Sequence, residues 1–335
     1  MTATVLPTHT PALFRAAVTR AAELLHAGEV VALPTETVYG LAANALNAAA
    51  VAKIFTIKGR PAQNPIIIHV ASIDMAKRYV TDWPAPAGQL AKSFWPGPLT
   101  LVLPKSGTIP DLVAAGGATV GLRWPSHPFM QAVIRECGFP LAAPSANLSN
   151  QVSPTNAGHV GKTLGGKIAL IVDGGQSQVG IESTVIDLTA TPPRVLRPGM
   201  IHEESLTAVV GNIQYSTSKV PPQNLRSPGL LTKHYAPKAK LVILNWASDA
   251  DLRRQIENRK SKIESAHVIA HTQIPSNEGL GGVSVMPHDA EAFARALYGE
   301  MHRCDEAGAE LVVVEALPDT LEWHAISDRL NRAAS

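Results

Sequence analysis

Cysteine, aromatic residues and long apolar runs are all scarce in this sequence. The two cysteines, Cys137 and Cys304, are far apart and outside any paired motif, which excludes a disulfide framework and a cysteine-based metal site. Phe, Tyr and Trp make up 5% of the chain, so no aromatic stacking platform for nucleic acid stands out. No apolar stretch approaches the roughly 20 residues that span a bilayer, and Met1 to Thr10 lacks the pattern of a secretory signal. We therefore expect a cytoplasmic protein from a reducing compartment, with no membrane partner.

The composition is that of a globular protein with ample core. Hydrophobic residues make up 45% of the chain and charged residues 17%, which excludes a disordered protein. At 335 residues the chain exceeds the usual size of a single core, so two domains are expected. The formal net charge of +2 is compatible with anionic ligands and with RNA, and it requires neither.

Short apolar runs alternate along the chain with helical patterns, such as those over 128–137 and 249–257, which is typical of an α/β protein. After residue 95 the expected strands outnumber the helices, so the first sheet should be mixed. From about Gly211 to Pro237 the chain is rich in Ser, Thr, Asn, Gln and Pro, the composition of a linker. We predict a twisted mixed sheet with flanking helices over 12–202, a linker over 203–238, and a small Rossmann-like open-sheet α/β domain over 239–335.

The stretch from Lys58 to Val70 places two cations on a rigid loop at the mouth of a strand. Pro61 and Pro65 remove backbone donors and fix φ, so the loop cannot continue a helix. The β-branched run 66–68 then predicts a buried strand over 66–70. Ligands of α/β proteins bind at such strand ends, and the guanidinium of Arg60 suits phosphate or carboxylate. The stretch is therefore a candidate anion site.

The same arrangement recurs at other strand ends, where cations and hydroxyl or amide side chains gather. The cations are Lys58, Arg60, Arg123 and Arg197, and the neutral polar residues are Thr35, Asn64, Ser145 and Ser183. Together they predict a cleft that binds a phosphate-bearing ligand and a small polar ligand. The pattern does not name the reaction.

Each of these features also has a structural interpretation. Residues 34–41 fit a capped helix start as well as a set of donors around a ligand. Arg123 fits a surface ion pair as well as a ligand contact. Ser145 is a conceivable nucleophile, but the Gly-x-Ser-x-Gly elbow and an evident His–acid pair are absent, which argues against that role.

Several ordered motifs resemble the YrdC-like family, and the two-domain layout resembles its long form. The motifs that carry the resemblance are Pro34 to Leu41, Lys58 to Pro65 with His69, Pro96 to Thr100, Pro144 to Asn147, Glu182 to Thr184, Arg197 to Gly199, Ser227 to Gly229 and Lys233 to Pro237. The resemblance covers residues from about 15 to 237, and the closing domain agrees in position and size. It implies a YrdC-like catalytic domain over 12–202.

The resemblance also implies a reaction. L-threonine, bicarbonate (or CO2) and ATP would give threonylcarbamoyl-adenylate and pyrophosphate, in an adenylyl transfer of the nucleotidyltransferase class. The product would pass to the machinery that installs threonylcarbamoyladenosine in tRNA, and a weak direct contact with RNA is possible. Mg²⁺ would arrive with ATP, and no metal ligand is expected from the protein itself.

Site residues follow from the matching motifs. The threonine site would contain Thr35, His69, Arg123, the Ala143 backbone and Ser183. The ATP site would contain Lys58, Arg60, Asn64, Thr119, Ser145, Ser153, Arg197 and the linker pair His234 and Tyr235. Lys58 and Arg60 would be the catalytic residues, because every reactant is anionic and the site must neutralise charge. The linker pair would close over the nucleotide.

Two other functions stay open at this point. An RNA-binding module without catalysis would also use cations at strand ends. A carbamoyl transferase of the hydrogenase-maturation type shares the first domain, but those longer proteins carry Cys-x-x-Cys metal motifs and this chain has none.

Overall fold

The chain folds into two compact units. The computed structural model describes residues 2–215, 227–228, 235–259 and 265–334. The first unit comprises Met1–Ser149 and Ser153–Leu231, and the second comprises Asn150–Val152 and Thr232–Ser335. Within the described ranges, no helix combines the length and the apolar character that crossing a membrane requires.

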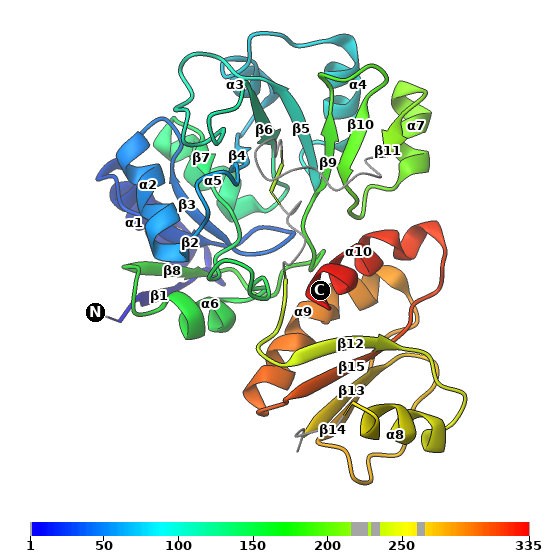
Figure 1. Ribbon diagram of the computed structural model, residues 1–335. Coiled ribbons are helices and arrows are strands. Elements are labelled where there is room, and N and C mark those ends of the chain that lie inside the picture. Colours follow the sequence, from blue (N-terminus) through cyan, green and yellow to red (C-terminus); the bar gives the residue numbers. More distant parts are fainter. Residues whose placement is uncertain (1, 216–226, 229–234, 260–264, 335) are drawn as a thin grey trace. The chain divides into compact units, whose positions relative to one another are not determined.

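A large mixed sheet forms the frame of the first unit. In spatial order its strands are β1 (Thr4–Pro7), β8 (Leu170–Asp173), β2 (Val31–Leu33), β3 (Gly40–Asn44), β7 (Leu141–Ala142), β4 (Ile68–His69), β6 (Thr119–Arg123), β5 (Leu99–Pro104), β9 (Thr184–Asp187), β10 (Arg194–Arg197) and β11 (Gln214–Tyr215). β2 runs parallel to β8 and antiparallel to β3, and β6 runs parallel to β4 and antiparallel to β5. Figure 1 shows β1 and β8 at one end of this sheet and β10 and β11 at the other.

Helices of the first unit begin and end at residues with clear local reasons. They are α1 (Pro11–His26), α2 (Ala48–Lys58), α3 (Ile73–Lys77), α4 (Ala85–Phe94), α5 (Pro128–Cys137), α6 (Ala157–Leu164) and α7 (Glu203–Val210). Asn47 caps α2 by accepting from two backbone amides, and Gly59 ends it at φ +59°, a left-handed conformation that suits glycine. The chain therefore leaves α2 at a defined angle, directly into the loop that carries Arg60.

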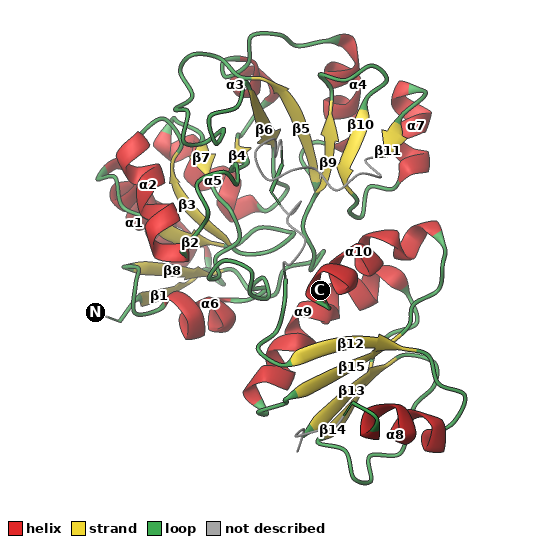
Figure 2. Ribbon diagram, in the orientation of Figure 1, coloured by secondary structure: helices red, strands yellow, loops and turns green. Residues whose placement is uncertain are grey.

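The second unit is built on a parallel sheet. In spatial order its strands are β12 (Lys240–Leu244), β15 (Leu311–Glu315), β13 (Ala266–Ala270) and β14 (Gly282–Val285). Its helices are α8 (Asp249–Glu257), α9 (Ala290–Glu306) and α10 (His324–Ala333), the last preceded by a 3₁₀ turn over Leu321–Trp323. Figure 2 shows α9 and α10 on one face of the sheet and α8 on the other. Helices on both faces explain the near-continuous apolar composition of β13 and β15.

The predicted fold class is confirmed: a twisted mixed sheet is followed by a small parallel-sheet domain. The helix predicted over 249–257 coincides with α8, while the strand predicted over 66–70 is shorter and forms β4. The helix-start interpretation of residues 34–41 is wrong. These residues form a turn and then enter β3, because Gly40 pairs with Leu33 in an antiparallel register.

The segment predicted as a linker, 203–238, begins with regular structure. Its first residues form α7, which buries Leu206, and β11, which adds to the edge of the sheet beside β10. The composition of the segment did not indicate this regular structure, because it does not show that Leu206 is buried. Residues 216–226 and 229–234 lie outside the described residues.

A glycine allows the chain beyond β10 to approach the start of β9. A Cβ atom on Gly199 would lie 2.4 Å from the amide nitrogen of Thr184 and 2.8 Å from the carbonyl carbon of Ser183. Both are backbone atoms, so neither can rotate away. The Thr184 hydroxyl also donates to the carbonyl oxygen of Ile201 at 2.9 Å. This close approach sets the path of the chain that follows Arg197.

Gly199→Ala should therefore lower the free energy of unfolding by about 1–3 kcal/mol, as expected when a methyl group is forced into packed backbone. Denaturant unfolding of the full chain would measure the loss. Gly107→Ala is the matched control, because a Cβ atom there meets nothing within 4 Å. Equal stability of the two variants would contradict the argument.

Candidate active site

Adjacent strands of the first unit bring together several residues that were predicted to bind L-threonine. His69 on β4 is the register partner of Arg123 on β6, and it pairs with Leu141 on the other side. Ala143 follows β7 and donates its backbone amide to the carbonyl oxygen of Ile67 at 3.2 Å. His69 and Arg123 are 3% and 4% exposed. The sheet register, rather than nearness in sequence, places these residues side by side.

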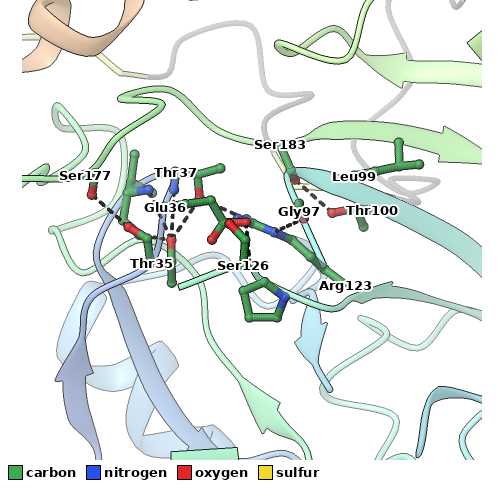
Figure 3. A network of polar contacts seen from close by, with 12 residues as sticks. Thr35, Glu36, Thr37, Gly97, Leu99, Thr100, Arg123, Ser126, Ser177 and Ser183 are labelled. Carbon is green, nitrogen blue, oxygen red and sulfur yellow. Dashed lines mark hydrogen bonds and ion pairs between the residues drawn. The ribbon is translucent and has the colours of Figure 1, made fainter. Parts of the chain in front are cut away.

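A buried ion pair joins the β2–β3 turn to β6. Nη2 of Arg123 lies 2.8 Å from Oε1 of Glu36, and both side chains are almost fully buried. The backbone amide of Ser126 donates to the same Oε1 at 3.0 Å. Figure 3 shows this pair at the centre of the polar network. Removing two charges from water is costly, so the pair requires the further hydrogen bonds that surround it.

Those further bonds come from two segments. Nε of Arg123 donates to the carbonyl oxygen of Gly97 at 3.3 Å, and Nη1 donates to the hydroxyl of Thr37 at 2.9 Å. The hydroxyls of Thr37 and Thr35 are 3.0 Å apart, and that of Thr35 donates to the carbonyl oxygen of Val38 at 2.6 Å. A guanidinium has five N–H groups. Among the described residues three of them have partners, which leaves one on each Nη for a ligand.

The residues predicted to bind L-threonine and those predicted to bind ATP come into contact at Ser183. The hydroxyl of Ser183 lies 2.8 Å from that of Thr100 on β5 and accepts from Nη2 of Arg197 at 3.1 Å. Nε of Arg197 also donates to the carbonyl oxygen of Ser183 at 3.0 Å. A residue predicted for threonine is thus bonded directly to one predicted for ATP phosphates.

Lys58 forms a second buried polar cluster. Its ammonium donates to the carbonyl oxygens of Ser145 and Asn147, at 2.6 and 2.5 Å, and to the Asn147 side chain at 3.2 Å. The backbone amide of Ser149 donates to the carbonyl oxygen of Lys58 at 2.9 Å. Lys58 therefore braces the loop that carries Ser145.

Arg60 braces its own loop in the same manner. Its Nε donates to the carbonyl oxygen of Asn64 at 3.0 Å, and Nη2 donates to that of Pro65 at 2.6 Å. Both Arg60 and Asn64 are buried. The Oδ1 atom of Asn64 has no hydrogen-bond partner in the described part of the chain. The loop is thus rigid and offers a polar atom for a ligand.

The remaining predicted ATP residues are placed differently. The hydroxyl of Ser153 donates to Oε1 of Glu182 at 2.6 Å, deep in the first unit. Thr119 starts β6 and is partly exposed, as is Ser145. Tyr235 belongs to the second unit, where its ring stacks on Tyr298 with centroids 6.0 Å apart. His234 lies outside the described residues.

Burial shifts the pKa values of three site residues. Burial lowers the pKa of His69 to about 3, assisted by the charge of Arg123, so the imidazole is neutral near pH 7. Burial, and secondarily the charge of Arg60, lowers the pKa of Lys58 well below its usual value, while its oxygen acceptors favour the ammonium. For Glu36, burial alone would raise the pKa, but the charge and hydrogen bond of Arg123 outweigh it and lower the pKa. The carboxylate therefore stays ionised.

Comparison with known proteins identifies the family of this chain. A family model described as telomere recombination matches residues 23–199, and one described as threonylcarbamoyl-AMP synthase, C-terminal domain, matches residues 201–335. The threonylcarbamoyl-AMP synthase of Pyrococcus abyssi is 40% identical over 94% of this chain and 93% of its own length. The chain belongs to the threonylcarbamoyl-AMP synthase family.

Two further comparisons support the assignment to this family. The threonylcarbamoyl-AMP synthase of Bacillus subtilis is 42% identical over 95% of this chain and 92% of its own length. A crystal structure of P. abyssi Sua5 complexed with L-threonine superposes with a TM-score of 0.90 at 37% identity, covering 100% of this chain and 98% of that one. The synthase-family fold therefore extends over both units.

Some polar residues of this synthase-family site were not predicted from the sequence. Glu36, Thr37 and Thr100 complete the bonding of Arg123 and Ser183, yet none of them was named as a site residue, although 34–41 was considered as a set of ligand donors. The available signal was a carboxylate in a turn directly after a buried strand. The surface ion pair considered for Arg123 is wrong in one respect, because the pair with Glu36 is buried.

Metal binding by this member of the family was predicted to come only with the nucleotide. Within the described ranges, no three His, Cys, Asp or Glu side chains are grouped as metal ligands. The association of Mg²⁺ with ATP stays a prediction.

The buried neutral His69 should make stability depend on pH. Between pH 6.5 and 3 the unfolded chain binds a proton that the folded chain does not, so the free energy of unfolding falls as the pH is lowered through that range. From pH 7 to pH 5 this residue should account for about 2 kcal/mol of the loss. Denaturant unfolding of His69→Asn should show a correspondingly smaller pH dependence, whereas the exposed control His9→Asn should behave like the wild type. An unchanged pH dependence in His69→Asn would contradict the buried neutral state.

Proposed function

We propose that this chain forms threonylcarbamoyl-AMP and pyrophosphate from L-threonine, bicarbonate (or CO2) and ATP, as an adenylyl transferase. The product serves the threonylcarbamoyladenosine modification of tRNA by a separate transfer machinery. The observation that carries the proposal is a pair of buried contacts, Arg123 with Glu36 and Ser183 with Arg197. The segment Gly97–Pro98 lies between them, because Gly97 accepts from Arg123 and Pro98 accepts from the amide that follows Ser183. It sets a group suited to an amino acid beside a group suited to phosphate. We retain the cytoplasm as the proposed location.

Each half of the site has a chemical task. Arg123 has two N–H groups for the carboxylate of threonine, and Thr35, neutral His69 and Ser183 offer partners for its hydroxyl and amino groups. Lys58, Arg60 and Arg197 supply positive charge for the phosphates, with Asn64, Thr119, Ser145 and Ser153 around the nucleotide. The proposed linker contacts of His234 and Tyr235 complete this set.

The reaction needs alignment and charge neutralisation more than proton transfer. The amine of threonine and CO2 form a carbamate, and a carbamate oxygen then attacks the α-phosphorus of ATP while pyrophosphate leaves. Nucleophile and leaving group are both anionic, so fixed cations stabilise the transition state more than the separated reactants. Mg²⁺ bound to the phosphates of ATP would add positive charge. The buried, braced positions of Lys58 and Arg60 suit this task because they need no reorganisation.

The purified chain should release pyrophosphate when given ATP, Mg²⁺, bicarbonate and L-threonine. Release should require threonine, because the carbamate is the nucleophile. A coupled pyrophosphate assay with and without threonine measures this directly. Threonine-independent release, or none, would count against the synthase. Salt-sensitive RNA binding without affinity for ATP or threonine would instead favour the RNA-binding module considered from the sequence.

Arg60→Ala and Arg197→Ala should each lower kcat/KM by a factor that corresponds to a loss of about 2–4 kcal/mol of transition-state stabilisation. The size is expected by analogy with the loss of one fixed electrostatic donor. The same assay gives the ratio, and thermal unfolding checks that each variant is folded. Arg15→Ala, an exposed arginine on α1, is the matched control and should keep full activity. Near-normal turnover in both site variants would remove them from the mechanism.

A further inference from the structure

The carboxylate of Glu36 is used on one side only. Its Oε1 is paired with the guanidinium of Arg123 and accepts from the amide of Ser126. Its Oε2 is buried and has no hydrogen-bond partner among the described residues. An ionised carboxylate has about four acceptor sites. An unsatisfied buried charged oxygen is expensive, and such an atom in a folded protein calls for an explanation.

The surroundings of Glu36 indicate what Oε2 lacks. The neighbouring side chains include hydroxyls, the imidazoles of His69 and His127, and the guanidinium of Arg123, which is already paired with Oε1. Figure 3 shows the carboxylate between the Thr35–Thr37 pair and Arg123. The Nδ1 atom of His69 is likewise buried without a partner in the described part of the chain. An ionised oxygen in this position is best matched by a cationic hydrogen-bond donor.

An α-amino acid carries such a donor beside its carboxylate. The Glu36–Arg123 pair presents one anion and one cation in contact, and each has bonding capacity left. A zwitterion has the complementary pair of charges on a single carbon atom. If the ligand carboxylate takes the two remaining N–H groups of Arg123, its ammonium lies on the side of the ion pair where the anion is. Both charges would then be matched without separating Glu36 from Arg123.

We propose that Glu36 is a specificity residue that receives the ammonium group of the amino-acid substrate on Oε2 while its Oε1 orients Arg123. This inference rests on the proposed function, which makes L-threonine the ligand. It gives the site a means of selecting free α-amino acids over hydroxy acids that carry the same carboxylate and side chain. It also explains why a charged group is kept in the turn that follows β2.

Calorimetry with two ligands tests this role. One is L-threonine, and the other is (R)-3-hydroxybutanoate, which keeps the carboxylate and the hydroxyl but has hydrogen in place of the ammonium. Glu36→Gln should weaken threonine binding by about 10- to 100-fold, the usual effect of losing a hydrogen bond between charged groups. It should change hydroxybutanoate binding by less than about threefold. The matched control is Glu29→Gln, an exposed carboxylate paired with Lys53, which should bind both ligands as the wild type does.

The possible results separate the alternatives. If Glu36 only held Arg123 in place, Glu36→Gln would weaken both ligands equally, and that result would overturn the proposal, as would unchanged threonine binding. If Glu36→Gln does not fold, the wild type decides: removing the ammonium from the ligand should itself weaken binding about 10- to 100-fold, and a loss below threefold overturns the role. A wild type that binds no threonine overturns the proposed function itself, whereas a wild type that binds both ligands alike overturns only the role of Glu36.

Discussion

The buried ion pair between Glu36 and Arg123 is the constraint on which the candidate threonine site depends. It ties the turn after β2 to the end of β6, and its desolvation is offset only because Thr37, Gly97 and the Ser126 amide complete the bonding. Removing either charged partner would leave the other charge buried and unpaired, at a cost of about 3–5 kcal/mol. The site is therefore rigid before any ligand arrives, which is what a reaction governed by alignment requires.

Lys58 and Arg60, on the proposed nucleotide side, are held in a similar way. Among the described residues they donate mainly to backbone carbonyl oxygens, so the cations fix the loops that surround them. Such polar groups cost stability, and the protein places them where an extensive apolar core surrounds them. Among the described residues, the buried polar atoms without a hydrogen-bond partner include Oδ1 of Asn64, Nδ1 of His69 and Oε2 of Glu36. These buried polar groups lower the stability of the fold and provide atoms that a ligand can bond.

Local structure was predictable wherever it depends on neighbouring residues. The helix expected over 128–137 coincides with α5, because Pro128 opens it and Gly138 closes it at φ +73°. The run 66–70 was recognised as buried, although only Ile68 and His69 pair as a strand, since pairing depends on the partners β6 and β7. The turn over 34–39 was ambiguous for the same reason: its capping residues fit a helix, and only the pairing of β3 with β2 decides otherwise.

Taken by itself, the sequence determined the fold class, the rigid Gly- and Pro-bearing loops, and the collection of cations and hydroxyls at strand ends. Residue type and spacing are enough for these features because they act over a few neighbouring residues. The tertiary structure alone decided that Arg123 bonds Thr37, 86 positions away, and that Ser183 joins the two halves of the site. Those pairings depend on sheet order and register, which bring β4, β6, β5 and β9 together. A carboxylate such as Glu36 shows its role only once its partner across the sheet is known.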